Sequence, residues 1–161
     1  MKKLIVLMAI FISSCSNKVE IKEVNKKAGE WVSTGTQYLI GSDEQVEIVK
    51  SLIANYAAMD AEAVFTNTRD SLRLFPFNLE EPLFVKVDDI KEMFSEYDSI
   101  ITVPFYFLPY ELDGVRRVVQ VSLNQTKYKK DGTIEEDFFL EKFVFGDDGK
   151  IHTVRQWRAA W

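Results

Sequence analysis

The sequence predicts one α+β domain in which N-terminal helices cover one face of a curved antiparallel sheet. Apolar residues recur at helical spacing in the first part of the body and alternate with a period of two from about residue 100 onward. Three Asp-Gly pairs separate the later strand patterns, and Asp-Gly is a strong signal for a tight hairpin. Helices followed by a strand meander are typical of the α+β class.

The helical patterns have recognisable starts. Ser42-x-x-Gln45 is a capping box, and Asp60 is an N-cap residue before a second, shorter pattern. Asp89-x-x-Glu92 opens a third helix. The expected helices and their apolar faces are 42–58 (Val49, Leu52, Ile53, Tyr56), 61–67 (Ala61, Val64, Phe65) and a third from Asp89 onward (Ile90, Met93, Phe94, Tyr97).

The strand patterns include one between the second and third helices and four after them. Pro76 ends the first one. Strands of about 13 residues exceed the usual length, so we expect them to be twisted and bulged. The expected ranges are 71–77, 100–110, 115–128, 133–145 and 150–159.

The N-terminus has the pattern of a bacterial lipoprotein signal. Lys2 and Lys3 precede an apolar run over 4–12. Nine residues rise only about 14 Å as a helix, which is too short for a hydrocarbon core of about 30 Å. Ile12-Ser13-Ser14-Cys15 resembles the lipobox, in which the cysteine is acylated after cleavage before it. The alternative is an ordinary secretory signal with a chance cysteine.

These features predict three segments: a signal peptide over 1–14, a lipid-anchored tether over 15–40 and a folded domain over 41–161. The expected location is the bacterial cell envelope, with the lipid on Cys15 as the membrane anchor. Acyl chains add roughly 0.8 kcal/mol per buried CH₂, so two or three chains hold a protein firmly. The sequence does not distinguish the inner from the outer membrane.

Composition argues against several classes of protein. The chain has 20 Lys and Arg against 25 Asp and Glu, a net charge of -5, which argues against a nucleic-acid binder. With one Cys and one His, the usual structural zinc sites are not available, and we expect no metal. No Gly-rich phosphate loop is present, and we expect no cofactor. The acidic run Glu135-Glu136-Asp137 is assigned to a solvated strand paired with Lys127 and Lys129, rather than to a metal site.

The body resembles the nuclear transport factor 2-like superfamily, which includes SnoaL-like and ketosteroid isomerase-like proteins. The stretches that carry the resemblance are VEIVKSLIANYAAMDAEAVF, TRDSLRLF, DDIKEMFSEY and FFLEKFVFGDDGKIHTVRQW. It covers roughly 42–161. The resemblance implies a cone whose sheet wraps a long helix and opens to an apolar pocket, and many members form dimers through the outer sheet face.

The resemblance also indicates which catalytic residues are missing. The base of a ketosteroid isomerase would fall near Phe75 or Pro76, and its oxyanion-hole tyrosine near Leu52, so neither role is filled. Two weak candidates remain from related enzymes: Asp70, beside Arg69, and His152, the sole histidine. The alternatives are an exposed ion pair at Asp70 and an exposed hairpin histidine.

Strand parity adds a third catalytic candidate and a set of ligand-binding candidates. On 133–145 both faces are apolar, so one face is expected to pack on the helices and the other on a second subunit, which predicts a homodimer. If Glu141, Arg155 and Trp157 face inward, they form an aromatic pocket with a few polar groups. The alternative is a packed core with a structural ion pair. The expected ligand-binding residues are Tyr56, Tyr106, Gln120, Arg155 and Trp157.

Two functions therefore remain. The first is a membrane-anchored lipoprotein whose non-catalytic domain binds a small apolar ligand or a protein partner. The second is a SnoaL-like enzyme that uses a pocket carboxylate, Asp70 or Glu141, as general acid and base. They differ in one observable, because an enzyme of this kind needs a buried, reachable carboxylate with a raised pKa. A filled cone, or exposure of both carboxylates, would exclude the second.

Overall fold

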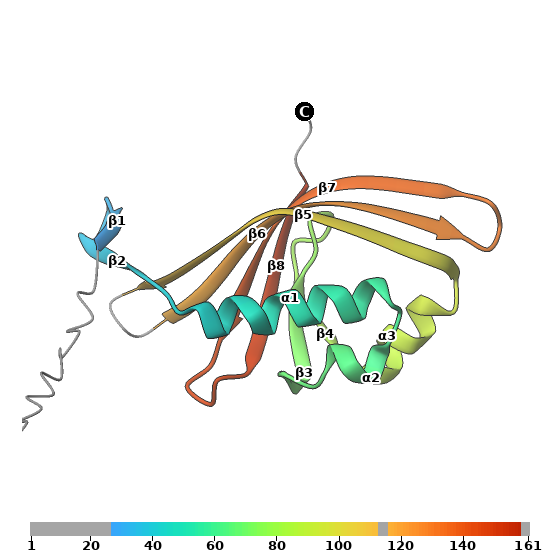
Figure 1. Ribbon diagram of the computed structural model, residues 1–161, viewed down its shortest axis with the longest axis horizontal. Helices are drawn as coiled ribbons and strands as arrows, with labels where there is room; N and C mark the ends of the chain where they lie inside the picture. Colours follow the sequence, from blue (N-terminus) through green and yellow to red (C-terminus); the bar gives the residue numbers. More distant parts are fainter. Residues whose placement is uncertain (1–26, 113–115, 159–161) are drawn as a thin grey trace, which may run out of the picture.

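The computed structural model describes residues 27–112 and 116–158 as three helices packed on one eight-stranded sheet (Figure 1). The strands lie in the order β1-β2-β5-β6-β7-β8-β3-β4. The elements are β1 (Lys27–Trp31), β2 (Thr36–Ile40), α1 (Asp43–Ala57), α2 (Ala61–Val64), β3 (Thr68–Phe75), β4 (Leu83–Val85), α3 (Val87–Phe94), β5 (Tyr97–Leu112), β6 (Arg116–Lys129), β7 (Ile134–Phe145) and β8 (Ile151–Arg158).

The predicted four-strand meander is confirmed. β5, β6, β7 and β8 pair antiparallel in sequence order. Gly132 and Gly149 have φ values of +87° and +75°, the conformation for which glycine is favoured in these turns. The predicted turn at Asp113-Gly114 lies outside the described residues. β5 carries a bulge between Pro104 and Tyr106, as its length led us to expect.

The sheet is not entirely antiparallel. β3 lies beside β8 and runs parallel to it, with Leu74 opposite Val154, and β4 pairs with the far side of β3. β3 ends at Phe75 because Pro76 has no N–H to continue the ladder. These strands extend the meander on the side away from the N-terminal hairpin, and they help to enclose one face of the sheet.

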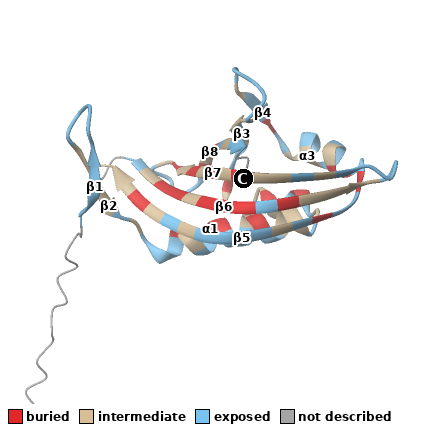
Figure 2. Cartoon of the chain, turned by 90° about the horizontal axis from the view of Figure 1, so that it is seen from above, coloured by how far each residue is buried: buried red, intermediate tan, exposed pale blue. Residues whose placement is uncertain are grey.

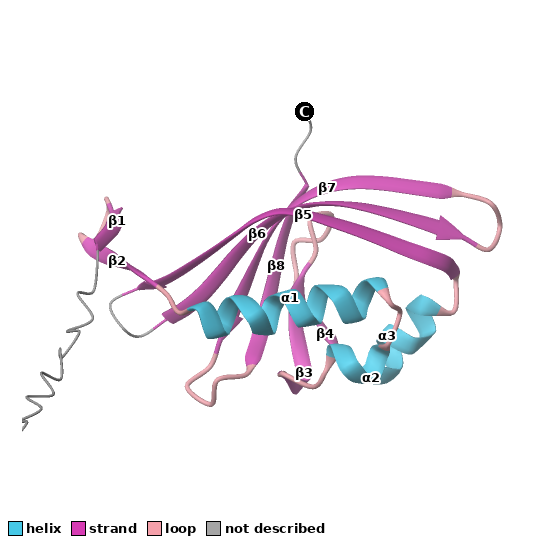
Figure 3. Cartoon of the chain, viewed as in Figure 1, coloured by secondary structure: helices cyan, strands magenta, loops and turns pink. Residues whose placement is uncertain are grey.

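The helices lie together on one side of the sheet (Figure 3). α1 buries Val49 and Ile53, and the core beneath it includes Val119, Val121 and Phe143 of the sheet. α2 and α3 lie beside the C-terminal half of α1, where Tyr56 meets the ring of Phe94 edge-on, with ring centroids 5.2 Å apart. Within the described ranges, no helix is both long enough and apolar enough to cross a membrane.

Helix boundaries differ from the predictions by one to three residues. The Ser42 Oγ accepts from the Gln45 N–H at 3.4 Å, but the Gln45 side chain is buried and its Oε1 has no partner within the described part, so only half of the capping box forms. α3 begins before Asp89, whose carboxylate accepts from the Lys86 N–H at 2.7 Å. Tyr97 belongs to β5 rather than to this helix.

The expected tether over 15–40 is wrong for its second half. Residues 27–40 form the β1–β2 hairpin, turning near Gly35 with φ of +70°, and β2 pairs with the end of β5. The Tyr38 ring meets the Tyr110 ring edge-on at 5.2 Å, which joins the hairpin to the sheet. Gly41 allows this approach, since a Cβ there would lie 2.9 Å from the Tyr110 nitrogen. Residues 15–26 lie outside the described residues.

The two faces of the sheet have different environments. Alternate residues of β6 and β7, including Val119, Val121, Phe139 and Phe143, are at most 2% exposed beneath the helices. Figure 2 shows the buried segments running along the centre of the sheet and α1, with the β1–β2 hairpin exposed at one end. We call the helix-covered face the inner face and the opposite one the outer face.

Candidate functional site

A cavity of about 230 Å³ lies between the helices, β3 and the inner face of the sheet. Apolar side chains from α1, α3 and the sheet form most of its wall. The recognition of a polar atom in this cavity therefore depends on a few polar side chains. These are Tyr56 of α1, Thr102 of β5, Gln125 and Lys127 of β6, Glu141 of β7 and Gln156 of β8.

Glu141 is the central polar group of the cavity. It is 6% exposed and lies opposite Gln156 across β7 and β8, and the Gln156 Nε2 donates to its Oε1 at 2.6 Å. Burial raises the pKa of the Glu141 carboxyl, while the Gln156 hydrogen bond and the charge of Lys127 oppose the rise. The side chain is thus a buried carboxyl that lines a cavity and favours its protonated form more than an exposed glutamate does.

Two hydroxyl groups in the cavity lack strong partners. The Tyr56 hydroxyl donates to the Met93 sulfur at 3.7 Å, which is a weak acceptor. Burial first, and the nearby Glu141 second, raise the Tyr56 pKa, so this phenol stays protonated. The Thr102 Oγ1 is buried and has no hydrogen-bond partner among the described residues. Buried polar groups without partners are rare, and each is available to a polar atom of a bound molecule.

Lys127 places a cation at the cavity without an ion pair to Glu141. Burial lowers the Lys127 pKa, and the carboxylates of Glu135, Asp137 and Glu141 oppose that effect. Lys129 pairs with Glu135 at 2.5 Å, which confirms the predicted charge pairing across this hairpin. Lys127 therefore offers a ligand in the cavity a second polar group, on the same face of the sheet as Glu141.

Four of the five predicted ligand-binding residues lie on the outer face, away from Glu141. The register pairs Glu141 with Gln156 and Lys142 with Arg155, so Arg155 and Trp157 point away from the cavity and our inward placement of them is wrong. Tyr106 and Gln120 are also on the outer face, where the Gln120 Nε2 donates to the Tyr106 Oη at 3.2 Å. The inward residue of β8 is Gln156. Of the predicted ligand-binding residues, the cavity brings only Tyr56 together with Glu141.

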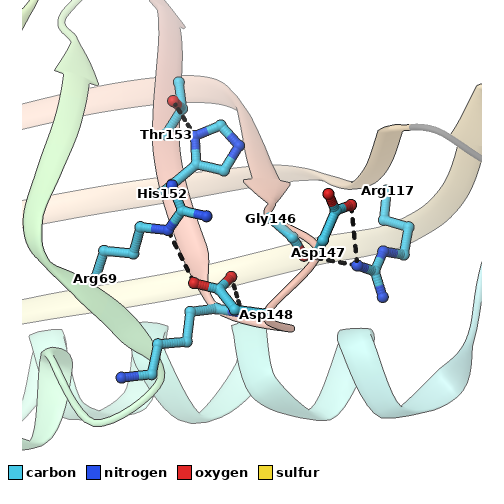
Figure 4. A network of polar contacts seen from close by, with 8 residues as sticks. Arg69, Arg117, Gly146, Asp147, Asp148, His152 and Thr153 are labelled. Carbon is cyan, nitrogen blue, oxygen red and sulfur yellow. Dashed lines mark hydrogen bonds and ion pairs between the residues drawn. The ribbon is translucent and has the colours of Figure 1, made fainter.

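The other two catalytic candidates are also outside the cavity. Asp70 is exposed, and Arg69 pairs with Asp148 at 3.0 Å instead of with Asp70. His152 Nδ1 is 2.8 Å from the Thr153 Oγ1 at the corner beside Arg69 (Figure 4). Burial, followed by the charges of Arg69 and Arg73, lowers the His152 pKa. Neither side chain lines the cavity that holds Glu141.

Comparison with known proteins identifies the architecture. No protein-family model matches the sequence, nor does any curated protein. Among solved structures, a SnoaL-like protein of unknown function from Burkholderia thailandensis is 14% identical with a TM-score of 0.57, and the match covers 75% of this chain and 99% of that chain. A ketosteroid isomerase-like protein from Erwinia carotovora atroseptica is 12% identical with a TM-score of 0.55, over 74% and 99% of the two chains. The domain has the nuclear transport factor 2-like fold.

Some structures with this fold are named as enzymes. The BvnE pinacolase from Penicillium brevicompactum is 11% identical to this chain with a TM-score of 0.57, and the match covers 72% of this chain and 86% of that one. At such identities the comparison establishes the fold, and the fold hosts many activities. The chemistry of this nuclear transport factor 2-like domain has to be argued from its own cavity.

The sequence analysis missed most of the cavity's polar residues. Gln125 and Lys127 share the parity of the buried Leu123 on β6, and Gln156 shares that of Val154 on β8. Their alternation with apolar residues was a usable signal. Thr102 lies opposite Gln125 across β5 and β6, a pairing that only the register of the sheet shows. Among the described residues, no group of three His, Cys, Asp or Glu side chains is arranged to hold a metal.

Proposed function

We propose that the domain binds a small, largely apolar molecule in the cavity and that Glu141 is its main polar contact. The observation that carries the proposal is a buried carboxyl on the wall of a largely apolar cavity. The hydroxyl groups of Tyr56 and Thr102, which line the same cavity, lack strong hydrogen-bond partners among the described residues. A volume of about 230 Å³ is below the roughly 300–1,000 Å³ of pockets for drug-sized ligands. The ligand is therefore a compact molecule with one or two oxygen or nitrogen atoms.

The test is native mass spectrometry of the purified protein for a small molecule that co-purifies with it. Leu52→Trp fills the cavity from α1 and is expected to remove the bound molecule while the protein keeps its fold by circular dichroism. Lys50→Trp, two residues earlier in α1 and outside the cavity lining, is the matched control and should keep the ligand. A protein that carries no ligand, and binds none from a library of compact apolar carbonyl and hydroxyl compounds, would contradict the proposal.

The raised pKa of Glu141 favours a second function, proton transfer to or from the bound molecule. General acid–base groups work best with a pKa near the working pH, and burial moves a glutamate in that direction. Glu141→Gln keeps the side-chain shape and an oxygen that can accept from Gln156. If Glu141 acts catalytically, this variant keeps ligand affinity within about threefold and loses about 10²–10⁴ in turnover. If Glu141 only binds, no turnover of the identified ligand is found in the wild-type protein.

We also propose that Cys15 is acylated and tethers the domain to a membrane of the bacterial cell envelope. The support is the signal pattern, with the sole cysteine at the lipobox position; Cys15 itself lies outside the described residues. Cys15→Ala is expected to shift the protein from the membrane to the soluble fraction, or to leave it unprocessed. Normal processing and membrane fractionation of Cys15→Ala would contradict the anchor.

A homodimer through the outer face is the remaining proposal. Its support is an apolar stripe on β5, where Ile101, Val103 and Phe105 are 49%, 50% and 58% exposed. Exposed apolar surfaces of this kind commonly mark interfaces. Phe105→Glu is expected to convert a dimer into a monomer in analytical ultracentrifugation. A wild-type protein that is monomeric at all accessible concentrations would contradict the proposal.

A further inference from the structure

A second hollow, of about 720 Å³, crosses the outer face at the end opposite the β6–β7 hairpin. We call it the outer groove. The β1–β2 hairpin borders one side with Trp31 and Tyr38, and β3 borders the other with Arg73 and Phe75. Between them it spans residues of β5, β6, β7 and β8. It is separated from the Glu141 cavity by the thickness of the sheet.

Cations and aromatic rings alternate across this groove. The Arg73 and Arg155 guanidinium carbons lie 4.6 Å and 4.2 Å from the centroid of the Phe75 ring. Arg155 also lies 5.9 Å from the Trp157 centroid. On the next strand, the Lys142 Nζ lies 5.4 Å from Trp157 and 6.0 Å from Tyr110. Stacking on rings fixes the positions of the three charges on β3, β8 and β7.

The positive charge of the groove is not balanced by the described residues that line it. In these residues Arg73, Lys142 and Arg155 have no carboxylate within ion-pair distance, whereas Arg69 pairs with Asp148 and Arg117 with Asp147 at the groove's edge (Figure 4). Asp147 is the one acidic residue of the described lining. Burial lowers the Lys142 pKa most, and the charge of the neighbouring Arg155 lowers it further. Such a cluster is unusual in a chain with a net charge of -5.

Two features make this a binding groove rather than a solvated charged surface. Stacking against Phe75, Trp157 and Tyr110 removes part of the solvation of the cations and holds them in line. An anion placed there gains from three fixed charges without ordering their side chains first. The exposed rings of Trp31 and Trp157, at 51% and 40%, offer apolar surface beside them.

We propose that the outer groove binds an organic dianion: a molecule with a flat or apolar body and a carboxylate or phosphate group at each end. Arg73 on β3 holds one anionic group, Lys142 on β7 holds the other, and Arg155 on β8 lies between the two strands. β3 and β7 are separated by β8, so these subsites are two strand spacings, or about 10 Å, apart. Trp157, whose ring centroid lies 5.9 Å from the Arg155 guanidinium carbon and 5.4 Å from the Lys142 Nζ, contacts the body of the ligand. This site is independent of the Glu141 cavity and of the function proposed for it.

The test is calorimetric titration of the full chain with three matched probes. Biphenyl-4,4′-dicarboxylate carries two charges about two strand spacings apart; biphenyl-4-carboxylate carries one, and biphenyl-4,4′-dimethanol carries none. We expect the dicarboxylate to bind at least tenfold more tightly than the other two, and its affinity to fall as salt is raised. Equal affinities for the dicarboxylate and the diol, or salt-independent binding, would overturn the proposal.

Variants assign the binding to this groove. Arg155→Gln and Lys142→Gln are each expected to weaken dicarboxylate binding at least fivefold, and Arg155→Lys less than Arg155→Gln. Lys130→Gln removes the same charge at the far end of the sheet and is expected to change affinity less than twofold. Thermal melts of each variant establish that it is folded. Unchanged affinity in both folded glutamine variants would overturn the proposal, since neither side chain reaches the cavity on the inner face.

Discussion

The inner and outer faces of β7 and β8 carry an acidic and a basic group at adjacent positions. Glu141 lies opposite Gln156, and the next pair along, Lys142 and Arg155, lies on the other face. The inner pair is a carboxyl and an amide joined by a 2.6 Å hydrogen bond under the helices. The outer pair is two cations stacked on aromatic rings in an open groove.

The two pairs avoid the cost of a buried or crowded charge in different ways. Burial raises the pKa of the Glu141 carboxyl, and the hydrogen bond from the Gln156 amide opposes that rise. Lys142 and Arg155 lie in the open groove, and each rests near an aromatic ring. Burial therefore gives the inner face a carboxyl with a raised pKa, and the outer face carries cations beside aromatic rings.

Phe143→Ala is expected to have the largest effect, because it removes a 1% exposed ring from the inner-face core. Truncations of this kind cost about 3–5 kcal/mol. Trp157→Ala, on the outer face and 40% exposed, is the matched control and should cost less than half as much. Urea unfolding at constant m-value measures both. Equal losses would mean that the outer face is as tightly packed as the inner face.

Glu141→Gln is expected to change how stability depends on pH. Burial raises the folded-state pKa of Glu141 above its ordinary 4.5. The protonated group therefore makes its full contribution to the free energy of unfolding below about pH 4.5, and this contribution is lost as pH rises through the folded-state pKa. Each pH unit between the two pKa values costs about 1.4 kcal/mol. The variant lacks this loss, so its stability relative to wild type rises between pH 4.5 and pH 8 in urea titrations.

Glu136→Gln is the control for that prediction, since its side chain is exposed on the same strand. Its stability relative to wild type should vary little over the same range of pH. A constant difference between wild type and Glu141→Gln from pH 4.5 to pH 8 would show that the carboxyl is not held in a raised-pKa environment.

Lys142→Met tests the outer pair and has a smaller expected effect. It removes a cation beside Arg155 and keeps the apolar stem against Trp157, so repulsion is relieved at low salt. We expect a gain of between 0 and about 1 kcal/mol at low ionic strength, falling toward zero near 1 M salt. Thermal melts at the two salt concentrations measure this. A clear loss of stability at low salt would show that the stacked ammonium is a net stabilising contact.

Gly146→Ala has the smallest expected effect. A Cβ there would lie 2.5 Å from an Arg69 guanidinium nitrogen and 2.6 Å from the Asp148 Oδ1, so the flexible ends of that ion pair must move. The Arg69 hydrogen bond is the main reason that the Asp148 pKa lies below its ordinary value. Carboxyl NMR titration is expected to show the Asp148 pKa returning toward that value, with the melting temperature unchanged. An unaltered Asp148 pKa would contradict the close contact.

The sequence predicted the helices and the meander well because their signals are local. Ser42 and Asp60 cap helices where their side chains suggested, and the Asp-Gly turns at 131–132 and 148–149 join antiparallel strands. It missed the β1–β2 hairpin, because its strands are only five residues long and are held by the contact between Tyr38 and Tyr110, which are 72 residues apart in the sequence. That contact has no local sequence pattern.

For the site, sequence alone determined which residues of one strand share a face, since side chains alternate with a period of two. It placed Glu141 with Phe139 and Phe143, and this grouping holds on the inner face, where all three are buried. It did not determine the register between strands. The tertiary structure decided that Gln156, rather than Arg155 or Trp157, lies opposite Glu141, because a one-residue shift exchanges the two faces of a strand. Only the packed sheet shows which alternate set faces the helices.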